Sequence, residues 1–272
     1  MNAAPGNAGE LLRRWRQRRA LSQLALASEA DISQRHLSFL ESGRSRPSRD
    51  MVLHLGERLD IPLRERNLIL TAAGHAPHYP HRGLDTPELS AVRGMIDRVL
   101  HGHLPHPALA VDRRWTLLSA NPAARKLMAG AASHLLEGEV NVLRLSLHPE
   151  GLAPRILNLP EWRAHLLARL KHDIRQSADA ALATLHDEIV AFPCPISTTP
   201  PASDPEREGR IAVPLRLRSD AGPLAFLSTT TVFGTATEVT LSEVTIEAFL
   251  PADDKTAHTM MRGPRADRSR NR

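Results

Sequence analysis

Two short helical patterns between residues 22 and 48 constrain this sequence more than any other feature. The first opens on Ser-Gln-Leu-Ala, and serine favours a helix start because its hydroxyl can accept a free N–H group of the first turn. The second begins at Ser33, places Leu37 and Leu40 on one side, and ends at Gly43, since glycine commonly follows a helix. We therefore expect two helices that cross through a tight turn.

The face of the second helix opposite its leucines carries residues that can read DNA. Ser33, Gln34 and Arg35 occupy its first turn, and Phe39 lies one turn further along. Glutamine can bond adenine and arginine can bond guanine in the major groove, while phenylalanine can touch the methyl group of thymine. The pattern predicts a helix-turn-helix unit whose partner is double-stranded DNA. A helical module that binds another protein is the alternative.

Further helical patterns complete an all-α domain over residues 9–74. Leu12 and Trp15 mark the buried side of a first helix, Ser48 can begin a fourth, and a fifth runs from about 62 to 73. Connections of this length are typical of a small helical bundle.

The basic residues are concentrated at the two ends of the sequence. Residues 1–83 hold 13 arginines against 8 acidic residues, and residues 262–272 hold 5 arginines against one aspartate, although the whole chain has a net charge of only +5. Clustered positive charge attracts a polyanion such as nucleic acid. An ordinary solvated surface is the alternative.

The sequence carries no sign of export or membrane insertion. It has no run of 18 apolar residues, and its N-terminus lacks the apolar segment of a secretory signal. Its one cysteine, Cys194, cannot form an internal disulfide, which fits a reducing compartment. We expect a cytoplasmic protein with no membrane span.

Residues 75–87 predict a linker, because this segment is rich in proline, histidine and glycine. A helical pattern at 87–101 follows, then two short β-like runs that turn around Asp112, and then a helix capped by Asn121.

The remainder of the chain predicts helices followed by strands. Two helices are expected at 159–175 and 180–190, the second capped by Ser177, followed by strands at 211–217, 224–233 and 244–250. Pro214 favours a sheet edge or a β-bulge for the first of these strands, because proline cannot donate to a ladder. The fold class is therefore an all-α helix-turn-helix domain followed by an α+β domain.

The pattern SQLA at residues 22–25, followed by LE-x-G-x-x-x-PS at 40–48, resembles the lambda-repressor-like, XRE-type helix-turn-helix regulators over about residues 9–74. By matching position, the resemblance implies phosphate contacts for Gln23, Arg44 and Arg46. It also implies a structural ion pair between Arg16 and Glu41. A single recognition helix reads few base pairs, so we expect a homodimer on a two-fold site.

Several short segments support a second resemblance, and they are HLSFLESG at 36–43, LRERN at 63–67, AAG at 72–74, LAVDRRW at 109–115 with Asn121, LRL at 143–145, HPEGL at 148–152, FGTA at 233–236 and LPAD at 250–253. Together they resemble the MmyB-like family of bacterial transcription regulators. The resemblance implies a PAS-like ligand-binding domain over residues 88–257, with a small apolar ligand and fatty acids as the suggested class. Residues 258–272 are expected to form a basic, disordered tail.

The candidate pocket residues of this domain are the large apolar side chains of its expected strands and helices, namely Val111, Trp115, Leu117, Trp162 and Phe226. The two tryptophans could equally fill the core. A dimerisation domain with a filled core is the alternative to a ligand-binding domain.

We expect no catalytic residues, no cofactor and no metal site. The histidines at 75, 78, 81 and at 101, 103, 106 lie among prolines and glycines without cysteines, which favours polar loop residues over metal ligands. The segment 148–151 is expected to anchor a loop, because its histidine and glutamate are too close in a turn to act as an acid and base across a substrate. An enzyme with a PAS-like or hydrolytic domain that autoregulates is the alternative, but common catalytic motifs are absent from the sequence.

Overall fold

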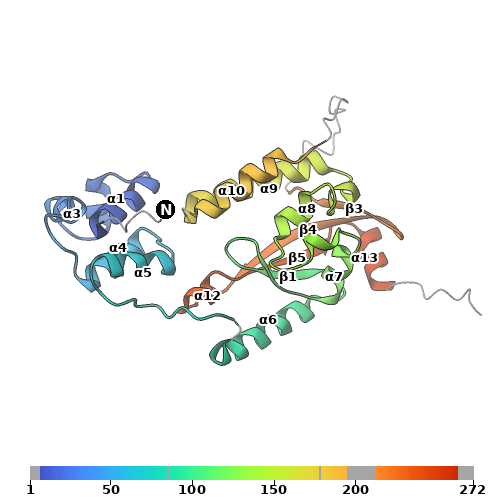
Figure 1. Ribbon diagram of the computed structural model, residues 1–272, viewed down its shortest axis with the longest axis horizontal. Coiled ribbons are helices and arrows are strands. Elements are labelled where there is room, and N and C mark those ends of the chain that lie inside the picture. Colours follow the sequence, from blue (N-terminus) through green and yellow to red (C-terminus); the bar gives the residue numbers. More distant parts are fainter. Residues whose placement is uncertain (1–6, 85, 178, 195–211, 263–272) are drawn as a thin grey trace, which may run out of the picture. The chain divides into compact units, whose positions relative to one another are not determined.

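The computed structural model describes residues 7–84, 86–177, 179–194 and 212–262, and its contacts divide the chain into two compact units (Figure 1). The N-terminal unit comprises residues 1–86 together with residues 234–242. The C-terminal unit comprises residues 87–233 and 243–272. Within the described ranges, no helix is long and apolar enough to cross a membrane.

Five helices form the main body of the N-terminal unit, and they are α1 (Ala8–Arg18), α2 (Gln23–Glu29), α3 (Gln34–Glu41), α4 (Arg49–Arg58) and α5 (Leu63–Ala72). The side chains of Ser22, Ser33 and Ser48 accept N–H groups at the starts of α2, α3 and α4, as the sequence predicted. Leu12, from α1, packs in a single apolar core with residues of all five helices.

Gly9 allows α1 to approach the end of α3 closely. A Cβ atom at this position would lie 1.9 Å from the carbonyl oxygen of Leu40, so any larger residue would push the two helices apart. The turn between α2 and α3 is filled in part by Ile32, which packs against the core. Close packing therefore fixes how α3 lies against α1 and against α2.

The C-terminal unit is built on a five-stranded antiparallel sheet with the order β2-β1-β5-β4-β3. Its strands are β1 (Ala108–Val111), β2 (Leu117–Ala120), β3 (Leu215–Ser219), β4 (Gly222–Val232) and β5 (Thr245–Pro251). Strand β3 lies at the edge of the sheet, which confirms the predicted edge position. It begins only after Pro214, and residues 212–214 are not part of it, so the predicted range 211–217 starts too early.

Helices precede, interrupt and follow these strands, and they are η1 (Pro87–Leu89), α6 (Ser90–Gly102), α7 (Pro122–Met128), η2 (Ser133–Leu135), α8 (Val142–Leu147), η3 (Ala153–Arg155), α9 (Leu159–Ser177), α10 (Ala180–Ala191) and α13 (Asp254–Arg262). The apolar core contains Leu109, Leu217 and Phe226 from the sheet and Leu166 and Leu185 from the helices. The expected order of hairpin, helices and late strands is confirmed.

Asn121 joins three elements of the C-terminal unit. Its side chain is fully buried, accepts the N–H groups of Ala108 and Ala124, and donates to the carbonyl oxygens of Leu100 and His106, at 2.9–3.1 Å. It begins α7 as predicted, and it also holds the end of α6 and the start of β1. All four hydrogen bonds of the amide are thus used inside the fold.

Two predictions about helix ends are wrong. Helix α10 is capped by Asp179, whose carboxylate accepts the N–H of Ala181, whereas Ser177 is the last residue of α9. The chain also remains helical beyond residue 257, because Asp253 accepts the N–H of Thr256 and starts α13. The expected disordered tail therefore begins no earlier than residue 263, outside the described residues.

Candidate DNA-binding face and ligand pocket

Helix α3 presents its predicted reading residues to solvent. Leu37 and Leu40 are 0% and 1% exposed and hold one side of the helix in the core, while Gln34 and Arg35 are exposed. The hydroxyl of Ser33 accepts the N–H of His36 at 3.1 Å and so caps the helix. The exposed first turn is the part of a recognition helix that reaches base edges.

Phe39 is placed between two arginines. The guanidinium of Arg35 lies 5.4 Å from the centre of its ring, and that of Arg44 lies 5.7 Å away. Cations at these distances are attracted to an aromatic face. The structure therefore brings a predicted base-reading arginine and a predicted phosphate-binding arginine together around one half-buried ring.

Arg16 and Glu41 form a buried, two-pronged ion pair. The Nε and Nη2 atoms of Arg16 donate to the two carboxylate oxygens of Glu41 at 2.6 and 2.8 Å, and Nη1 donates to the carbonyl oxygen of Leu21. The hydrogen bonds to Glu41 raise the pKa of Arg16. This pair joins α1 to the end of α3 and confirms the expected structural contact.

Gln23 belongs to the same network. Its amide nitrogen donates to Glu41 at 2.8 Å, a structural role that the sequence did not reveal. Arg46, another predicted phosphate contact, is exposed, and its guanidinium lies against Gly74, where an added Cβ atom would be 1.8 Å from Nη2. Gly74 also has a φ of +76°, so two constraints favour glycine there.

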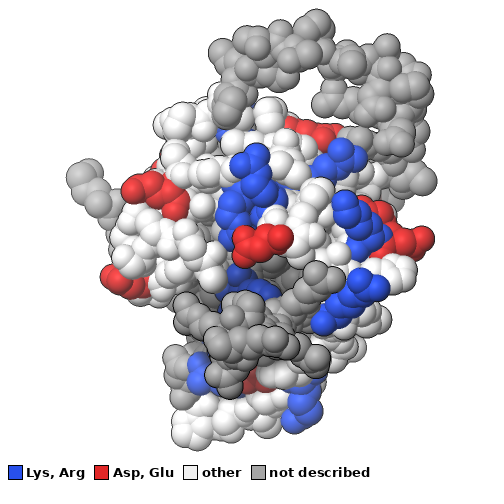
Figure 2. All heavy atoms as spheres, turned by 90° about the vertical axis from the view of Figure 1, so that its right-hand side faces the viewer, with Lys and Arg blue, Asp and Glu red and all other residues white. Residues whose placement is uncertain are grey.

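On the face drawn in Figure 2, Lys and Arg are interspersed with Asp and Glu, and no continuous field of one sign is visible. The surplus of positive charge in the sequence lies at its two ends instead.

An apolar pocket of about 80 Å³ lies inside the C-terminal unit, between the sheet and its helices. Trp115 and Trp162 line it together with leucines, while Ser146 and Ser228 add isolated hydroxyl groups. An empty apolar cavity of about 150 Å³ is large enough for benzene. A long apolar chain that is fully enclosed there would therefore displace some of the lining side chains.

The polar part of the pocket wall is a compact charged network. Arg169 donates to both carboxylate oxygens of Glu247, at 3.0 and 2.5 Å, and to the hydroxyl of Thr230 at 3.0 Å. Its guanidinium lies 4.6 Å from the ring of Trp115, whose Nε1 donates to Asp173 at 3.0 Å. The guanidinium of Arg169 is therefore held by Glu247, by Thr230 and by the ring of Trp115.

The pKa values in this network follow from burial and pairing. Burial raises the pKa of Asp173, against the lowering effects of the Trp115 hydrogen bond and of Arg169. Burial alone would lower the pKa of Arg169, but the hydrogen bond and charge of Glu247 outweigh it and raise that pKa.

The ligand-binding domain model of the MmyB-like transcription regulators matches residues 92–262, and a helix-turn-helix model matches residues 12–66. The chain belongs to the MmyB-like transcription regulators. It combines an XRE-type helix-turn-helix region with a ligand-binding domain, and the residues that line the pocket all lie within the matched ligand-binding range. No curated protein matches the chain.

Only two of the five predicted pocket residues of this MmyB-like regulator line the pocket. Trp115 and Trp162 do so, while Val111 and Phe226 are 1% and 0% exposed and fill the core, and Leu117 packs against that core. Apolar character alone does not separate a cavity wall from a packed interior, so the sequence pattern could not distinguish these three from the two tryptophans.

Arg169 and Glu247 also line the pocket, although the sequence pattern did not predict them. In β5 the apolar residues Ile246 and Ala248 alternate with Glu247 and Phe249. Ile246, Glu247 and Ala248 are all buried, and Glu247 and Phe249 face the pocket. A buried acid inside an otherwise apolar strand was the available signal, because such a group needs a partner.

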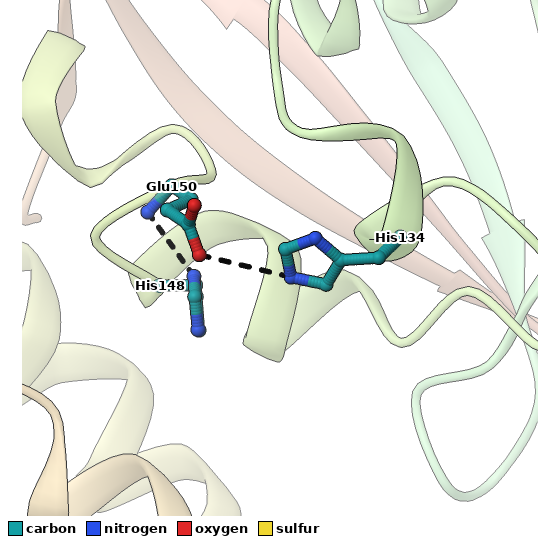
Figure 3. A group of neighbouring side chains, drawn as sticks. All are labelled: His134, His148 and Glu150. Carbon is teal, nitrogen blue, oxygen red and sulfur yellow. Dashed lines mark hydrogen bonds and ion pairs between the residues drawn. The ribbon is translucent and has the colours of Figure 1, made fainter.

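His134, His148 and Glu150 form the one group with metal-ligand spacing among the described residues of this regulator, with ligand atoms within 4.8 Å of one another (Figure 3). Within the same described ranges, the two histidine sets weighed from the sequence form no such group. The Nδ1 atom of His148 accepts the backbone N–H of Glu150 at 3.1 Å, so its lone pair is used inside the turn. The Nε2 atom of His134 lies 3.9 Å from Glu150.

The turn at residues 148–151 also packs closely against α8. The N–H of Gly151 donates to the carbonyl oxygen of His148, and a Cβ atom at Gly151 would lie 2.1 Å from the carbonyl oxygen of Leu145. The N–H of Ala132 donates to the carbonyl oxygen of Glu150 and ties a second loop to the turn. These contacts give the segment 148–151 the anchoring role that the sequence predicted.

Proposed function

We propose that this regulator binds a specific DNA site as a homodimer in the cytoplasm and changes its DNA affinity when a small apolar ligand occupies the C-terminal unit. The observation that carries the first part is the exposed first turn of α3 on a helix fixed by the buried Arg16–Glu41 pair. A rigidly held reading helix can discriminate between bases, since misplaced donors lose their hydrogen bonds.

In this proposal the two kinds of DNA contact are divided between two groups of residues. Ser33, Gln34, Arg35 and Phe39 read bases, while Gln23, Arg44 and Arg46 hold phosphates. The grouping is supported by the exposure of Gln34, Arg35 and both later arginines. Phosphate contacts set affinity and register, and base contacts set specificity.

We propose a PAS-like fold for the C-terminal unit and a fatty acid as its ligand class. The antiparallel sheet, with its run of helices between β2 and β3, supports the fold. The apolar lining of the pocket supports an acyl chain, and the family match supports a ligand-binding role. We assign no catalytic residue, cofactor or metal to the protein.

Arginine substitutions in the full-length protein test the DNA-binding part. Arg35→Ala should lower discrimination between the selected site and random DNA by about 1–3 kcal/mol, whereas Arg44→Ala should weaken both and lower the salt slope by about one unit. Fluorescence anisotropy over a range of salt concentrations measures both quantities. An equal loss on specific and random DNA for Arg35→Ala would overturn the base-reading role.

Thermal unfolding with decanoic, dodecanoic and hexadecanoic acids tests the ligand-binding part. A ligand that binds only the folded protein raises its unfolding temperature. No increase with any of the three acids would contradict the proposed ligand class and favour a filled dimerisation domain.

A further inference from the structure

Residues 234–242 join β4 to β5 in the sequence, yet their contacts group them with the N-terminal unit. They contain the short helix α12 (Val239–Ser242), which lies beside the chain that follows α5 (Figure 1). They fall within residues 88–257, the range that the resemblance implied for the ligand-binding domain. We call residues 234–242 the linker clasp.

The linker clasp makes three hydrogen bonds to the linker that was predicted at residues 75–87. The N–H of Val239 donates to the carbonyl oxygen of Pro80 at 2.9 Å, and Glu238 accepts the N–H of Arg82 at 2.8 Å. The hydroxyl of Thr240 donates to the carbonyl oxygen of Arg82. Val239 is 1% exposed and Glu238 is 9% exposed, whereas the hydrogen bond between Thr240 and Arg82 lies at the surface.

The other oxygen of the Glu238 carboxylate fixes the clasp itself. It accepts the N–H of Leu241 at 2.8 Å, so one side chain both caps α12 and holds the linker. A buried carboxylate needs such partners, because an unpaired charge away from water is costly. Both the cap of α12 and the hydrogen bond to the N–H of Arg82 therefore depend on Glu238.

Helix α5 holds the same stretch of linker by a second set of contacts. The amide of Asn67 donates to the carbonyl oxygen of Tyr79 at 2.7 Å and accepts the N–H groups of His78 and Tyr79. Arg66 donates to the Tyr79 hydroxyl at 3.2 Å. Helix α5 thus binds residues 78 and 79, and the linker clasp binds residues 80 and 82. Residues 78–82 are held by both elements.

Both strands that continue from the linker clasp contribute to the ligand pocket. Ser228 on β4 and Glu247 and Phe249 on β5 line it, and the two strands remain paired up to Val232 and Thr245, close to the ends of the clasp. An acyl chain enclosed in the free space of about 80 Å³ would have to displace lining side chains, some of which belong to β4 and β5. A shift of β4 and β5 would be carried along the chain into residues 234–242.

We propose that the linker clasp transmits ligand occupancy from the pocket strands to the DNA-binding unit by holding residues 78–82 against α5. The inference rests on the proposed function and adds the physical connection that the proposed function requires. Coupling between two sites is reciprocal, so DNA should change ligand affinity by the same factor as the ligand changes DNA affinity.

The test compares the full-length protein with a double variant, Glu238→Ala with Thr240→Val. It removes the two side-chain hydrogen bonds of the clasp to Arg82 and the Glu238 contact that caps α12, and it leaves the proposed DNA and ligand contacts in place. The control is Glu137→Ala with Thr229→Val, which removes one exposed acid and one threonine of β4 without touching the linker. Anisotropy measures DNA affinity with and without the acid that most raises the unfolding temperature. Thermal unfolding measures ligand binding in each variant.

In the wild type and the control, we expect the acid to change DNA affinity about 5- to 150-fold, the usual range for coupled sites. In the clasp variant, the change should fall below about 2-fold, while the unfolding temperature still rises with the acid and ligand-free DNA binding is retained. An undiminished change of DNA affinity in the clasp variant would overturn the inference. No change in the wild type would instead overturn the proposed function, and the inference with it.

Hydrogen exchange gives a readout that needs no ligand. The amides of Arg82 and Val239 should exchange slowly in the wild type and faster in the clasp variant. Fast exchange of both amides in the wild type would show that the clasp is open, and this result overturns the inference even where the acid changes DNA affinity.

Discussion

The Arg16–Glu41 pair shows how one interaction contributes to the stability of the folded protein and fixes the orientation of the recognition helix α3. The side chains are 10% and 2% exposed, and they connect α1 with the last turn of α3. Removing one partner of a buried ion pair leaves an uncompensated charge, whereas exposed pairs contribute little. We therefore expect Glu41→Ala to lower the free energy of unfolding by about 3–5 kcal/mol.

Urea denaturation measures this loss, and two comparisons define its cause. Arg14→Ala removes the exposed pair with Glu10 and should cost less than about 1 kcal/mol. The double variant Arg16→Met with Glu41→Leu should recover much of the loss, since apolar side chains replace both charges. A double variant as unstable as Glu41→Ala would argue against an unpaired charge as the cause.

Asp173 predicts a dependence of stability on pH. Its pKa is raised in the folded protein, first because of burial, so its contribution to stability is fully present below the ordinary pKa of aspartate and is lost as the pH rises through the raised value. Asp173→Asn keeps an acceptor for Trp115 and removes the charge. The variant should therefore be more stable than the wild type at pH 7.

Urea denaturation at several pH values checks this prediction. The gain of Asp173→Asn should shrink as the pH falls toward about 3.9, the ordinary pKa of aspartate, because the wild-type carboxyl is then neutral as well. Asp187→Asn is the control, since that side chain is 86% exposed. A gain that stays constant over the whole pH range would mean that ionisation of Asp173 is not responsible.

At the scale of elements, Asn121 shows that one polar side chain can join a helix, a strand and a helix start. Asn121→Ala leaves the N–H groups of Ala108 and Ala124 and two carbonyl oxygens without their partner in the interior. Each buried polar group left unsatisfied costs about 1–3 kcal/mol. We expect a loss of at least about 3 kcal/mol in the free energy of unfolding.

Asn141→Ala provides the matched comparison for Asn121→Ala in chemical denaturation. Asn141 also caps a helix, α8, but it is only half-buried, and the loss of a cap of this kind costs about 1 kcal/mol. Equal losses for the two variants would show that the additional contacts of Asn121 contribute nothing.

The elements that could be predicted from the sequence are those with a local cause. Ser22, Ser33 and Ser48 start helices through contacts within one turn, and Asn121 does the same, so their positions were visible in the residue pattern. The choice of Asp179 over Ser177 as a cap was not, because both residue types favour the position.

The pocket was predicted less well, because its wall depends on contacts between distant segments. Arg169 and Glu247 are 78 positions apart, and no periodicity connects them. The grouping of residues 234–242 with the N-terminal unit was also invisible, since the alternating pattern of the neighbouring strands says nothing about where their connection packs. Local patterns therefore predicted the secondary structure better than the pocket residues.

At the scale of the whole molecule, the small size of α3 leads to a prediction about symmetry. The helix has eight residues, and its exposed first turn can reach only a few base pairs. Specific regulators must distinguish one site from a large excess of random DNA, and two symmetric half-sites double the bases read. We expect a homodimer on a pseudo-palindromic site whose half-sites are about 10 base pairs apart, or a multiple of this distance.

Selection of binding sites from random DNA, combined with measurement of the mass of the protein–DNA complex, checks this expectation. Paired inverted half-sites and two chains per duplex would support it. Inserting five base pairs between the half-sites rotates one by about half a helical turn and should abolish high-affinity binding, whereas inserting ten should restore much of it. A site that returns as single half-sites, or an affinity that ignores the five-base-pair insertion, would mean that each chain reads DNA independently.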